Sequence, residues 1–307
     1  NGGRDGAKFA LTMMHKARKR FGQNFLIDER IIAEIIQAIH PQPDDNMVEI
    51  GPGLGALTRL LIQRVNLLHV VEIDRDIVSY LKKTFPADRL VIHSADALEF
   101  DFAQLFQPQF ESDTRRRQAS DEDSTNSTAR SERGSQHSST DKMGLESSLR
   151  IVGNLPYNIS SPLLFHLADY AHHICDMHFM LQKEVVERMV AAPSTPEYGR
   201  MSVMLQYRFS MEKLLEVPPA SFRPEPKVNS AVVRMIPLPA DEIKVTNAAR
   251  FAEIVTAAFA QRRKTLRNTL RAYLTVPDFQ QLGLDAQLRA ENLSVDDFIA
   301  IANYRQA

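Results

Sequence analysis

The sequence predicts an α/β fold: a doubly wound, largely parallel sheet followed by a small helical domain. Three observations lead to this prediction. Short apolar runs alternate with amphipathic segments of helical spacing from residue 28 to residue 93. A glycine turn, Gly51-Pro-Gly-Leu-Gly55, follows the first of these apolar runs. From about residue 240 the pattern becomes wholly helical, which marks a second, smaller unit.

The first third of the chain predicts alternating helices and strands. Asp28 is a typical N-cap, and isoleucines at helical spacing follow it until Pro41 stops the helix. The next segments predict a strand at 47–50, a helix at 57–65, a strand at 67–72, a helix at 76–84 and a strand at 90–93. This alternation, with the glycine turn after the first strand, is typical of a parallel sheet with helices on its faces.

The pattern resumes at residue 149 after a long interruption. The elements that we expect are a strand at 149–153, a helix at 161–170, a strand at 178–181, a helix at 183–191, and strands at 201–209 and 228–235. Residues 217–227 are too rich in proline for regular structure and predict an ordered loop. A long helix is expected from 248 to 274.

The interruption and the two ends define the predicted domains. Residues 107–148 are rich in Ser, Thr and charged side chains, so they cannot bury enough apolar surface to become ordered. We expect a disordered N-terminus or tag remnant at 1–15 and a Rossmann-like domain at 16–238 that carries residues 107–148 as a disordered insertion. A helical, RNA-binding C-terminal domain is expected at 239–307.

The composition bounds the class of protein. The 307 residues are 44% hydrophobic and 24% charged, and no apolar run approaches the roughly 20 residues that span a bilayer. The single cysteine, Cys175, excludes an internal disulfide and fits a reducing compartment, so we expect a cytoplasmic protein. We also expect a monomer without a metal ion or a membrane partner.

The glycine turn and three acids predict a cofactor site. Gly51 and Gly53 allow a ligand to approach the backbone, but Pro52 removes an N–H group that a pyrophosphate would need. Glu72 ends the second strand, 21 residues after Gly51, where an acid can accept both ribose hydroxyls. Asp96 follows the third strand and could accept from an adenine amine, and Glu49, inside the first strand, suits a cationic ligand. These features favour S-adenosylmethionine over a dinucleotide; the alternative is that the acids are helix caps and surface side chains.

The turn Asn154-Leu-Pro-Tyr157 predicts the reaction site. The Asn154 side-chain oxygen and the Leu155 carbonyl can accept hydrogen bonds from a purine amine, which favours a pyramidal nitrogen with its lone pair toward a methyl donor. Pro156 fixes the turn, and Tyr157 offers a stacking face for an extruded base. Phe179 could close the other side of such a base pocket, although a phenylalanine on a strand is usually a core residue.

Two basic clusters predict contacts with RNA phosphates, although the net charge of the chain is only −1. The clusters are Lys16, Arg18, Lys19 and Arg20 near the start, and Arg262, Arg263, Lys264, Arg267 and Arg271 near the end. In a continuous helix, three of the later arginines would be four residues apart and on one face, which suits a phosphate backbone. The alternative for either cluster is an ordinary solvated surface.

Six motifs in order resemble the ribosomal RNA adenine dimethyltransferases, from about residue 16 to the C-terminus. They are RFGQNFL (20–26), EIGPGLG (49–55), GNLPYNI (153–159), FMLQKEV (179–185), PKVNSAV (226–232) and FAQRRKTLR (259–267). The resemblance is strongest to the bacterial small-subunit members, and it implies a class I S-adenosylmethionine-dependent methyltransferase fold. The insertion after the third strand is where this chain departs from the family.

The resemblance also implies a substrate and site residues. The family dimethylates N6 of two adjacent adenosines in the 3′-terminal hairpin loop of 16S rRNA in the small (30S) ribosomal subunit, and it acts late in subunit assembly. Cofactor contacts are implied for Asn24, Leu26, Gly51, Glu72, Asp96 and Asn154. The reactive base is implied to contact Asn154, Leu155 and Tyr157, with Phe179 as a further candidate.

Two alternatives remain open from the sequence. One is the same chemistry on another nucleic acid, as in macrolide-resistance enzymes that act on 23S rRNA or in adenine-DNA methylases. The other is an assembly factor whose catalysis is secondary. The proline-rich loop, the full helical C-terminal domain and the RRKT run at 262–265 favour the small subunit, and the intact turn at 154–157 argues for retained catalysis.

Overall fold

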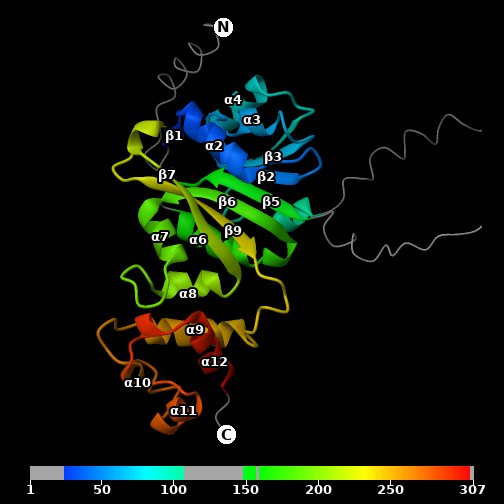
Figure 1. Ribbon diagram of the computed structural model, residues 1–307. Helices are drawn as coiled ribbons and strands as arrows, with labels where there is room; N and C mark the ends of the chain where they lie inside the picture. Colours follow the sequence, from blue (N-terminus) through cyan, green and yellow to red (C-terminus); the bar gives the residue numbers. More distant parts are fainter. Residues whose placement is uncertain (1–23, 107–147, 157–158, 305–307) are drawn as a thin grey trace, which may run out of the picture.

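The computed structural model describes residues 24–106, 148–156 and 159–304. Its centre is a seven-stranded sheet with the order β4-β3-β2-β5-β6-β9-β7 (Figure 1). The strands of this sheet are β2 (Asn46–Ile50), β3 (Leu68–Glu72), β4 (Leu90–Ser94), β5 (Leu149–Asn154), β6 (Ile174–Gln182), β7 (Phe209–Val217) and β9 (Ser230–Pro237). The five strands β4, β3, β2, β5 and β6 are parallel to one another. Strand β9 is antiparallel to both of its neighbours, β6 and β7. The predicted doubly wound sheet is confirmed, with an antiparallel edge.

Helices cover both faces of the sheet. One hydrophobic cluster joins the sheet to α2 (Glu29–Ile39), α3 (Thr58–Leu61) and α4 (Arg75–Thr84). A second joins the opposite face to α6 (Ser160–Ala168) and α7 (Lys183–Val190). Short 3₁₀ segments lie at η2 (Phe102–Leu105) and η3 (Ala171–His173). The carboxyl end of β2, the first strand of the large sheet in the sequence, therefore lies between the two helical layers. Ligands of such sheets bind at this position.

Helix α2 follows directly from its sequence. The Asp28 carboxylate accepts hydrogen bonds from the N–H groups of Arg30 and Ile31 at 3.0 and 3.3 Å, as an N-cap does. The helix ends at His40, which adopts the left-handed conformation. The predicted helix at 57–65 is shorter: regular α-helix spans only Thr58–Leu61, and turns continue to Val65.

The predicted strand at 201–209 is wrong, because these residues form helix α8 (Arg200–Gln206). Leu205 packs in the core between the sheet and α6, whereas Val203 and Tyr207 pack against the C-terminal helices. A helix buried on two opposite sides is apolar at alternate positions, which imitates the period of a strand. The strand of this region is β7, which the sequence analysis missed because its charged residues are typical of an edge strand.

The predicted continuous helix at 248–274 is also wrong. Helix α9 (Ala248–Phe259) ends before the polar run 261–264, and α10 (Leu266–Thr269) begins after it. The N–H groups of Leu266 and Arg267 donate to the carbonyls of Leu288 and Ala286, at 2.8 and 3.0 Å. Tertiary hydrogen bonds therefore replace the helical ones where the apolar stripe is interrupted.

The C-terminal helices share a core with the sheet domain. They are α9, α10, α11 (Val276–Gln281), the 3₁₀ segment η5 (Ala290–Asn292) and α12 (Val295–Asn303). The cluster that unites them includes Tyr198, Val203 and Tyr207, which precede the predicted boundary at 238. Figure 1 shows α8 between the sheet and α9, and α8 contacts both β7 and α9. The C-terminal helices therefore pack against the sheet domain through α8.

A second, two-stranded sheet lies beside the main one. Strand β1 (Phe25–Leu26) pairs antiparallel with β8 (Phe222–Arg223), which follows the 3₁₀ segment η4 (Pro219–Ser221). The proline-rich loop at 217–227 is therefore ordered, as predicted, but it contains a short strand. That strand holds the residues that precede α2.

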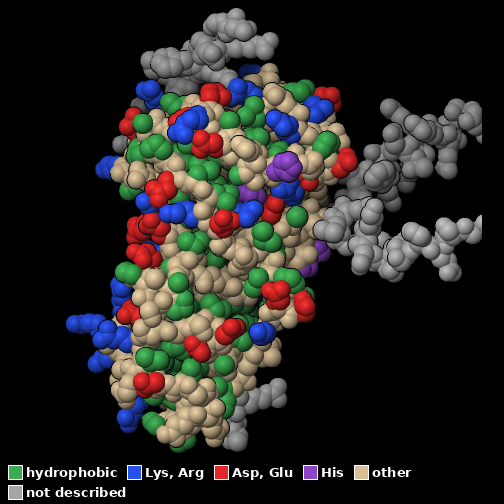
Figure 2. Space-filling model, in the orientation of Figure 1, with side chains coloured by type: hydrophobic (Ala, Val, Ile, Leu, Met, Phe, Trp, Pro, Cys, Tyr) green, Lys and Arg blue, Asp and Glu red, His purple; other side chains and the backbone are tan. Residues whose placement is uncertain are grey.

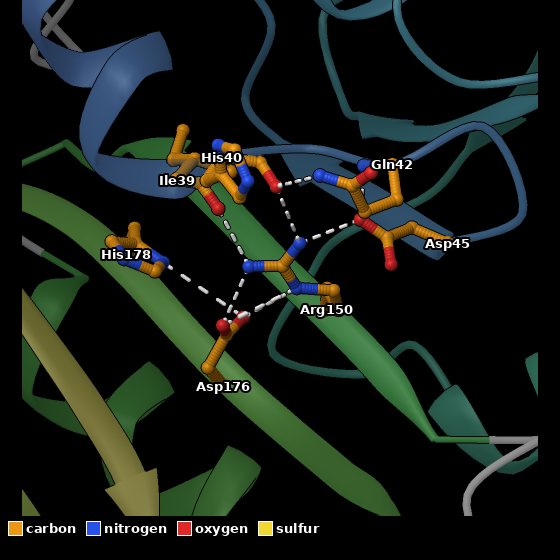
Figure 3. A network of polar contacts seen from close by, with 7 residues as sticks. All are labelled: Ile39, His40, Gln42, Asp45, Arg150, Asp176 and His178. Carbon is orange, nitrogen blue, oxygen red and sulfur yellow. Dashed lines mark hydrogen bonds and ion pairs between the residues drawn. The ribbon is translucent and has the colours of Figure 1, made fainter.

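A polar network closes the far end of the sheet. The guanidinium of Arg150, on β5, lies 2.5 Å from Asp45 Oδ2 and 2.7 Å from Asp176 Oδ2, and it donates to the carbonyl of Ile39 at 2.7 Å (Figure 3). Burial disfavours the charged form of Arg150, but the two carboxylates outweigh it and raise its pKa. The network fixes the C-terminal end of α2 against β5 and β6.

Some predictions lie outside the described residues: the N-terminal segment 1–15, the basic residues 16–20 and nearly all of the insertion at 107–148. In the described ranges, no helix is long and apolar enough to cross a membrane.

Candidate active site

One pocket of about 260 Å³ lies at the carboxyl ends of the parallel strands. It occupies the point where the strand order reverses, between β2 and β5. All seven predicted cofactor residues line it, together with two residues of the predicted catalytic turn. They are Asn24, Leu26, Gly51, Gly53, Glu72, Asp96 and Asn154, with Leu155 and Pro156. Segments more than 100 residues apart in the sequence therefore meet in one cavity.

The glycine loop is shaped for close approach of a ligand. Gly51 has φ +66° and Gly53 has φ +54°, conformations that glycine adopts without steric cost. A Cβ atom at Gly53 would lie 3.1 Å from Cδ1 of Phe25, and one at Gly51 would lie 3.7 Å from the carbonyl oxygen of Asn154. The loop therefore packs against both β1 and β5, and side chains at these positions would reduce the space of the pocket.

Two buried carboxylates face the pocket. Thr58 donates its hydroxyl to Glu49 Oε2 at 2.6 Å, and burial, together with the charge of Glu72, raises the pKa of Glu49 to about 7. Burial also raises the pKa of Glu72, although the N–H of Asp74 donates to its Oε1 at 2.8 Å and opposes the shift. Neither carboxylate has a cationic side-chain partner within the described residues. Buried acids in this state suit a ligand that brings positive charge and hydroxyl donors.

Asp96 caps a turn and also lines the pocket. Its Oδ1 accepts from the N–H of Leu98 at 2.9 Å, so it caps the turn after β4. The residue also lines the pocket, next to Ala95 and Ala97. A capping role and a ligand contact are compatible here, because a carboxylate has two oxygens.

The turn after β5 is held by hydrogen bonds on both sides. The N–H of Leu155 donates to the carbonyl of Met180 at 3.1 Å. The Asn154 Nδ2 donates to the carbonyl of Asn24 at 3.0 Å, and a carbonyl can only accept, so the orientation of the amide is defined. The Oδ1 atom of Asn154 therefore points away from Asn24. Tyr157 lies outside the described residues.

Phe179 occupies the core position that is usual for a phenylalanine on a strand. It is fully buried on β6 in the core cluster beneath the sheet, where Gly153 pairs with it, and it is not among the residues that line the pocket. The ordinary reading of a strand phenylalanine holds in this structure. Its role in closing a base pocket stays a prediction, because Tyr157, the proposed opposite side of that pocket, lies outside the described residues.

Several apolar residues of the pocket wall were not predicted from the sequence. Phe25, Ile73 and Ile77 line it, and Ile73 is 44% exposed directly after Glu72. In the sequence, the signal for this wall is an isoleucine that directly follows the acid at the end of a strand. This signal is weak in a single sequence. In the described part of the chain, no group of three His, Cys, Asp or Glu side chains could hold a metal ion.

The C-terminal basic residues are exposed, but they do not form a helical stripe. Arg262, Arg263 and Lys264 lie in the turn between α9 and α10, whereas Arg267 is in α10 and Arg271 follows it. Figure 2 shows Lys and Arg side chains projecting at the edge of the helical domain, over the connection of α9 and α10. Arg262 also lies 3.4 Å from Glu291 Oε2 and donates to the carbonyl of Pro196 at 3.4 Å, so it links the two domains.

A family model described as "Ribosomal RNA adenine dimethylase" matches residues 14–307. The chain belongs to the ribosomal RNA adenine dimethylase family. This dimethylase is 54% identical over 292 residues to ribosomal RNA small subunit methyltransferase A of Nitrosospira multiformis, across 95% of this chain and 97% of that protein. It is 53% identical over 291 residues to the protein of the same name from Thiobacillus denitrificans, across 95% and 98%. The resemblance read from the six motifs is confirmed.

Solved structures support the fold of this dimethylase. A dimethyladenosine transferase from Plasmodium falciparum superposes with a TM-score of 0.67 at 23% identity, over 90% of this chain and 95% of that chain. The 23S rRNA methyltransferase ErmE gives a TM-score of 0.62 at 21% identity, over 91% and 98%. At such identities these structures establish the architecture, including the helical C-terminal part.

Proposed function

We propose that this protein is an S-adenosylmethionine-dependent methyltransferase that converts two adjacent adenosines of 16S rRNA, in the 3′-terminal hairpin loop, into N6,N6-dimethyladenosines. The observation that carries the proposal is the meeting of Glu72, Asp96 and the Asn154 turn around one pocket in a chain of the dimethylase family. The names of relatives that match nearly the full length favour the small ribosomal subunit.

The residues of the pocket fit the cofactor. Glu72 would accept hydrogen bonds from the ribose hydroxyls, and Asp96 would accept from the adenine amine. The glycine loop leaves space for the methionine part, and the charge of Glu49 would favour its cationic groups. When bound, S-adenosylmethionine supplies an activated methyl group, so the protein needs no strong base.

The Asn154 turn would act on the target amine. Its Oδ1, set by the hydrogen bond from Nδ2 to Asn24, accepts from an N–H of the adenine, and the Leu155 carbonyl accepts from the other. These bonds favour a pyramidal nitrogen with an available lone pair. Tyr157 would stack on the base once it has left its helix.

The setting of the reaction follows from its substrate. We propose that the reaction takes place in the cytoplasm, during late assembly of the small subunit.

Methylation of isolated subunits tests the proposal. The protein is incubated with labelled S-adenosylmethionine and undermethylated small subunits, and dimethyladenosine is mapped by mass spectrometry. We expect label on two adjacent adenosines near the 3′ end of the small-subunit rRNA. Label only on large subunits would favour the macrolide-resistance type, and subunit binding without label would favour a pure assembly factor.

A further inference from the structure

Asn24, Phe25 and Leu26 form a wall of the pocket that is not part of the seven-stranded sheet. This segment precedes α2, and its strand, β1, belongs to the small two-stranded sheet. Its position therefore depends on what β1 pairs with.

On its inner side, the segment contacts the reaction site. The Asn24 carbonyl accepts from Asn154 Nδ2, and the Phe25 ring packs where a side chain on Gly53 would lie. The acceptor is a backbone atom, so a substitution of the Asn24 side chain cannot remove it. A displacement of the strand would release the Asn154 amide.

On its outer side, the segment is fastened to the proline-rich loop. The N–H of Ile27 donates to the carbonyl of Ser221 at 2.9 Å, and the buried Ser221 hydroxyl donates to Asp28 Oδ2 at 3.0 Å. The other carboxylate oxygen of Asp28 is the N-cap of α2. One side chain thus joins the loop, the end of β1 and the start of the helix.

We propose that Ser221 is a positioning residue of the methyl-transfer site. Through Asp28 and the pairing of β1 with β8, it holds Asn24–Leu26 against the glycine loop and thereby fixes the Asn154 amide. This inference rests on the proposed methyltransferase function. It adds a role for a loop far from the pocket in the sequence.

Two substitutions remove the same hydrogen bond. Ser221→Ala removes the donor, and Asp28→Ser keeps a side-chain oxygen to cap α2 but lacks the second oxygen. A hydrogen bond to a charged group corresponds to roughly a tenfold change in an equilibrium. For the full-length protein, calorimetry is expected to give S-adenosylmethionine binding weaker by about five- to tenfold in each variant. Single-turnover methyl transfer at saturating cofactor should also slow, while binding to small subunits stays unchanged.

The controls separate positioning from general stability. The double variant should lose no more than either single variant, because both remove one bond. Asp28→Asn should stay close to wild type, since its oxygen caps α2 and its amide can donate to the Ser221 hydroxyl. Ser294→Ala removes the N-cap of the distant α12, and it should lower the melting temperature without changing cofactor affinity.

The outcomes distinguish this inference from the proposed function. If wild-type protein transfers no methyl group, the proposed function fails. If wild type is active and Ser221→Ala binds the cofactor within twofold of it, the positioning role is refuted. An equal loss of affinity in Ser294→Ala would also refute it.

Discussion

At the scale of single residues, Asn154 connects the Asn24 wall of the pocket with the turn for which we propose the reaction. Its amide donates to Asn24 on one side, while Leu155 beside it is fixed to the carbonyl of Met180. The amide is neutral, so it can accept from an amine at every stage without adding a negative charge to the three carboxylates Glu49, Glu72 and Asp96. This property suits a site that acts twice on one nitrogen.

Replacement of Asn154 by Ala should separate binding from turnover. The variant should keep its affinity for small subunits, but methyl transfer should fall by about 10²–10³-fold, the usual effect of losing one electrostatic group at a reaction centre. Filter binding measures the first quantity and incorporation of labelled methyl groups the second. Wild-type incorporation by the variant would disprove the proposed role of the amide.

Replacement of Glu72 by Ala should abolish measurable cofactor binding. The acid is buried at the end of β3 and lines the pocket, and its loss would remove the acceptor that we propose for two ribose hydroxyls. Calorimetry with S-adenosylmethionine gives the affinity directly, and Glu99→Ala, an exposed acid near the same edge, is a matched control. Unchanged affinity in the Glu72 variant would remove this assignment.

The pKa of Glu49, about 7, predicts pH-dependent cofactor binding. A cation beside this group favours its ionised form, so the complex holds fewer protons than the free protein below pH 7. Affinity should therefore rise from pH 5.5 to pH 7.5, by at most about tenfold per pH unit, and level off above. Glu49→Gln, which can still accept from Thr58, should flatten the profile.

Glu49 also affects stability in the opposite direction. Its folded pKa is raised, so its contribution to stability is fully present below about pH 4.5 and is lost as the pH rises through about 7. Urea unfolding at pH 5 and pH 8 should show Glu49→Gln gaining stability over wild type only at the higher pH, by roughly 3 kcal/mol at most. A gain that is equal at both pH values would contradict the burial of an ionisable group here.

At the scale of elements, the connection of α9 and α10 decides what the basic cluster can contact. The break in the helix presents Arg263 and Lys264 on an exposed turn instead of along a helical face. We therefore expect any phosphate contacts of this cluster to come from the turn and not from one helical face.

Neutralising this turn should weaken RNA binding in a salt-dependent way. Each phosphate contact that is lost lowers the slope of log K against log salt by roughly 0.7–0.9. Arg263→Ala with Lys264→Ala should therefore reduce the slope by about 1.5, measured with small subunits between 50 and 200 mM salt. Lys82→Ala with Lys83→Ala on α4 changes the net charge equally, and an equal loss of slope there would show a nonspecific effect.

At the scale of the whole molecule, the two ends of the parallel strands differ: one end forms the pocket, and the other is closed by a polar network. The carboxyl ends of the strands form the pocket, and the opposite ends are closed by Arg150 and its two aspartates (Figure 3). His178 lies beside this network, fully buried, and burial lowers its pKa to about 4. The closed end stabilises the fold, and the open end is left for ligands.

Replacement of Arg150 by Met should destabilise the protein by roughly 3 kcal/mol, because Asp45 and Asp176 would remain partly buried without their partner. Arg30→Ala breaks the exposed pair with Glu34, and it should cost less than about 1 kcal/mol. Urea unfolding compares the two. An equal, small cost would show that the network contributes little to stability.

Local sequence patterns were enough to predict the parallel sheet, the N-cap of α2 and the glycine and polar residues that line the pocket. These depend on local patterns: strand periodicity, a glycine turn, and acids at strand ends. Only the tertiary structure decided that α8 is a helix, that α9 stops before Arg262, and that Phe179 is a core residue. In each case the deciding contact is distant in sequence. Helix α8 packs on the C-terminal helices as well as on the sheet, and the N–H groups of Leu266 and Arg267 donate to the carbonyls of Leu288 and Ala286. Phe179 packs in the core cluster that includes α6 and α7. The link from Ser221 to Asn154 is of the same kind, because it passes through two backbone carbonyls that no side-chain pattern can indicate.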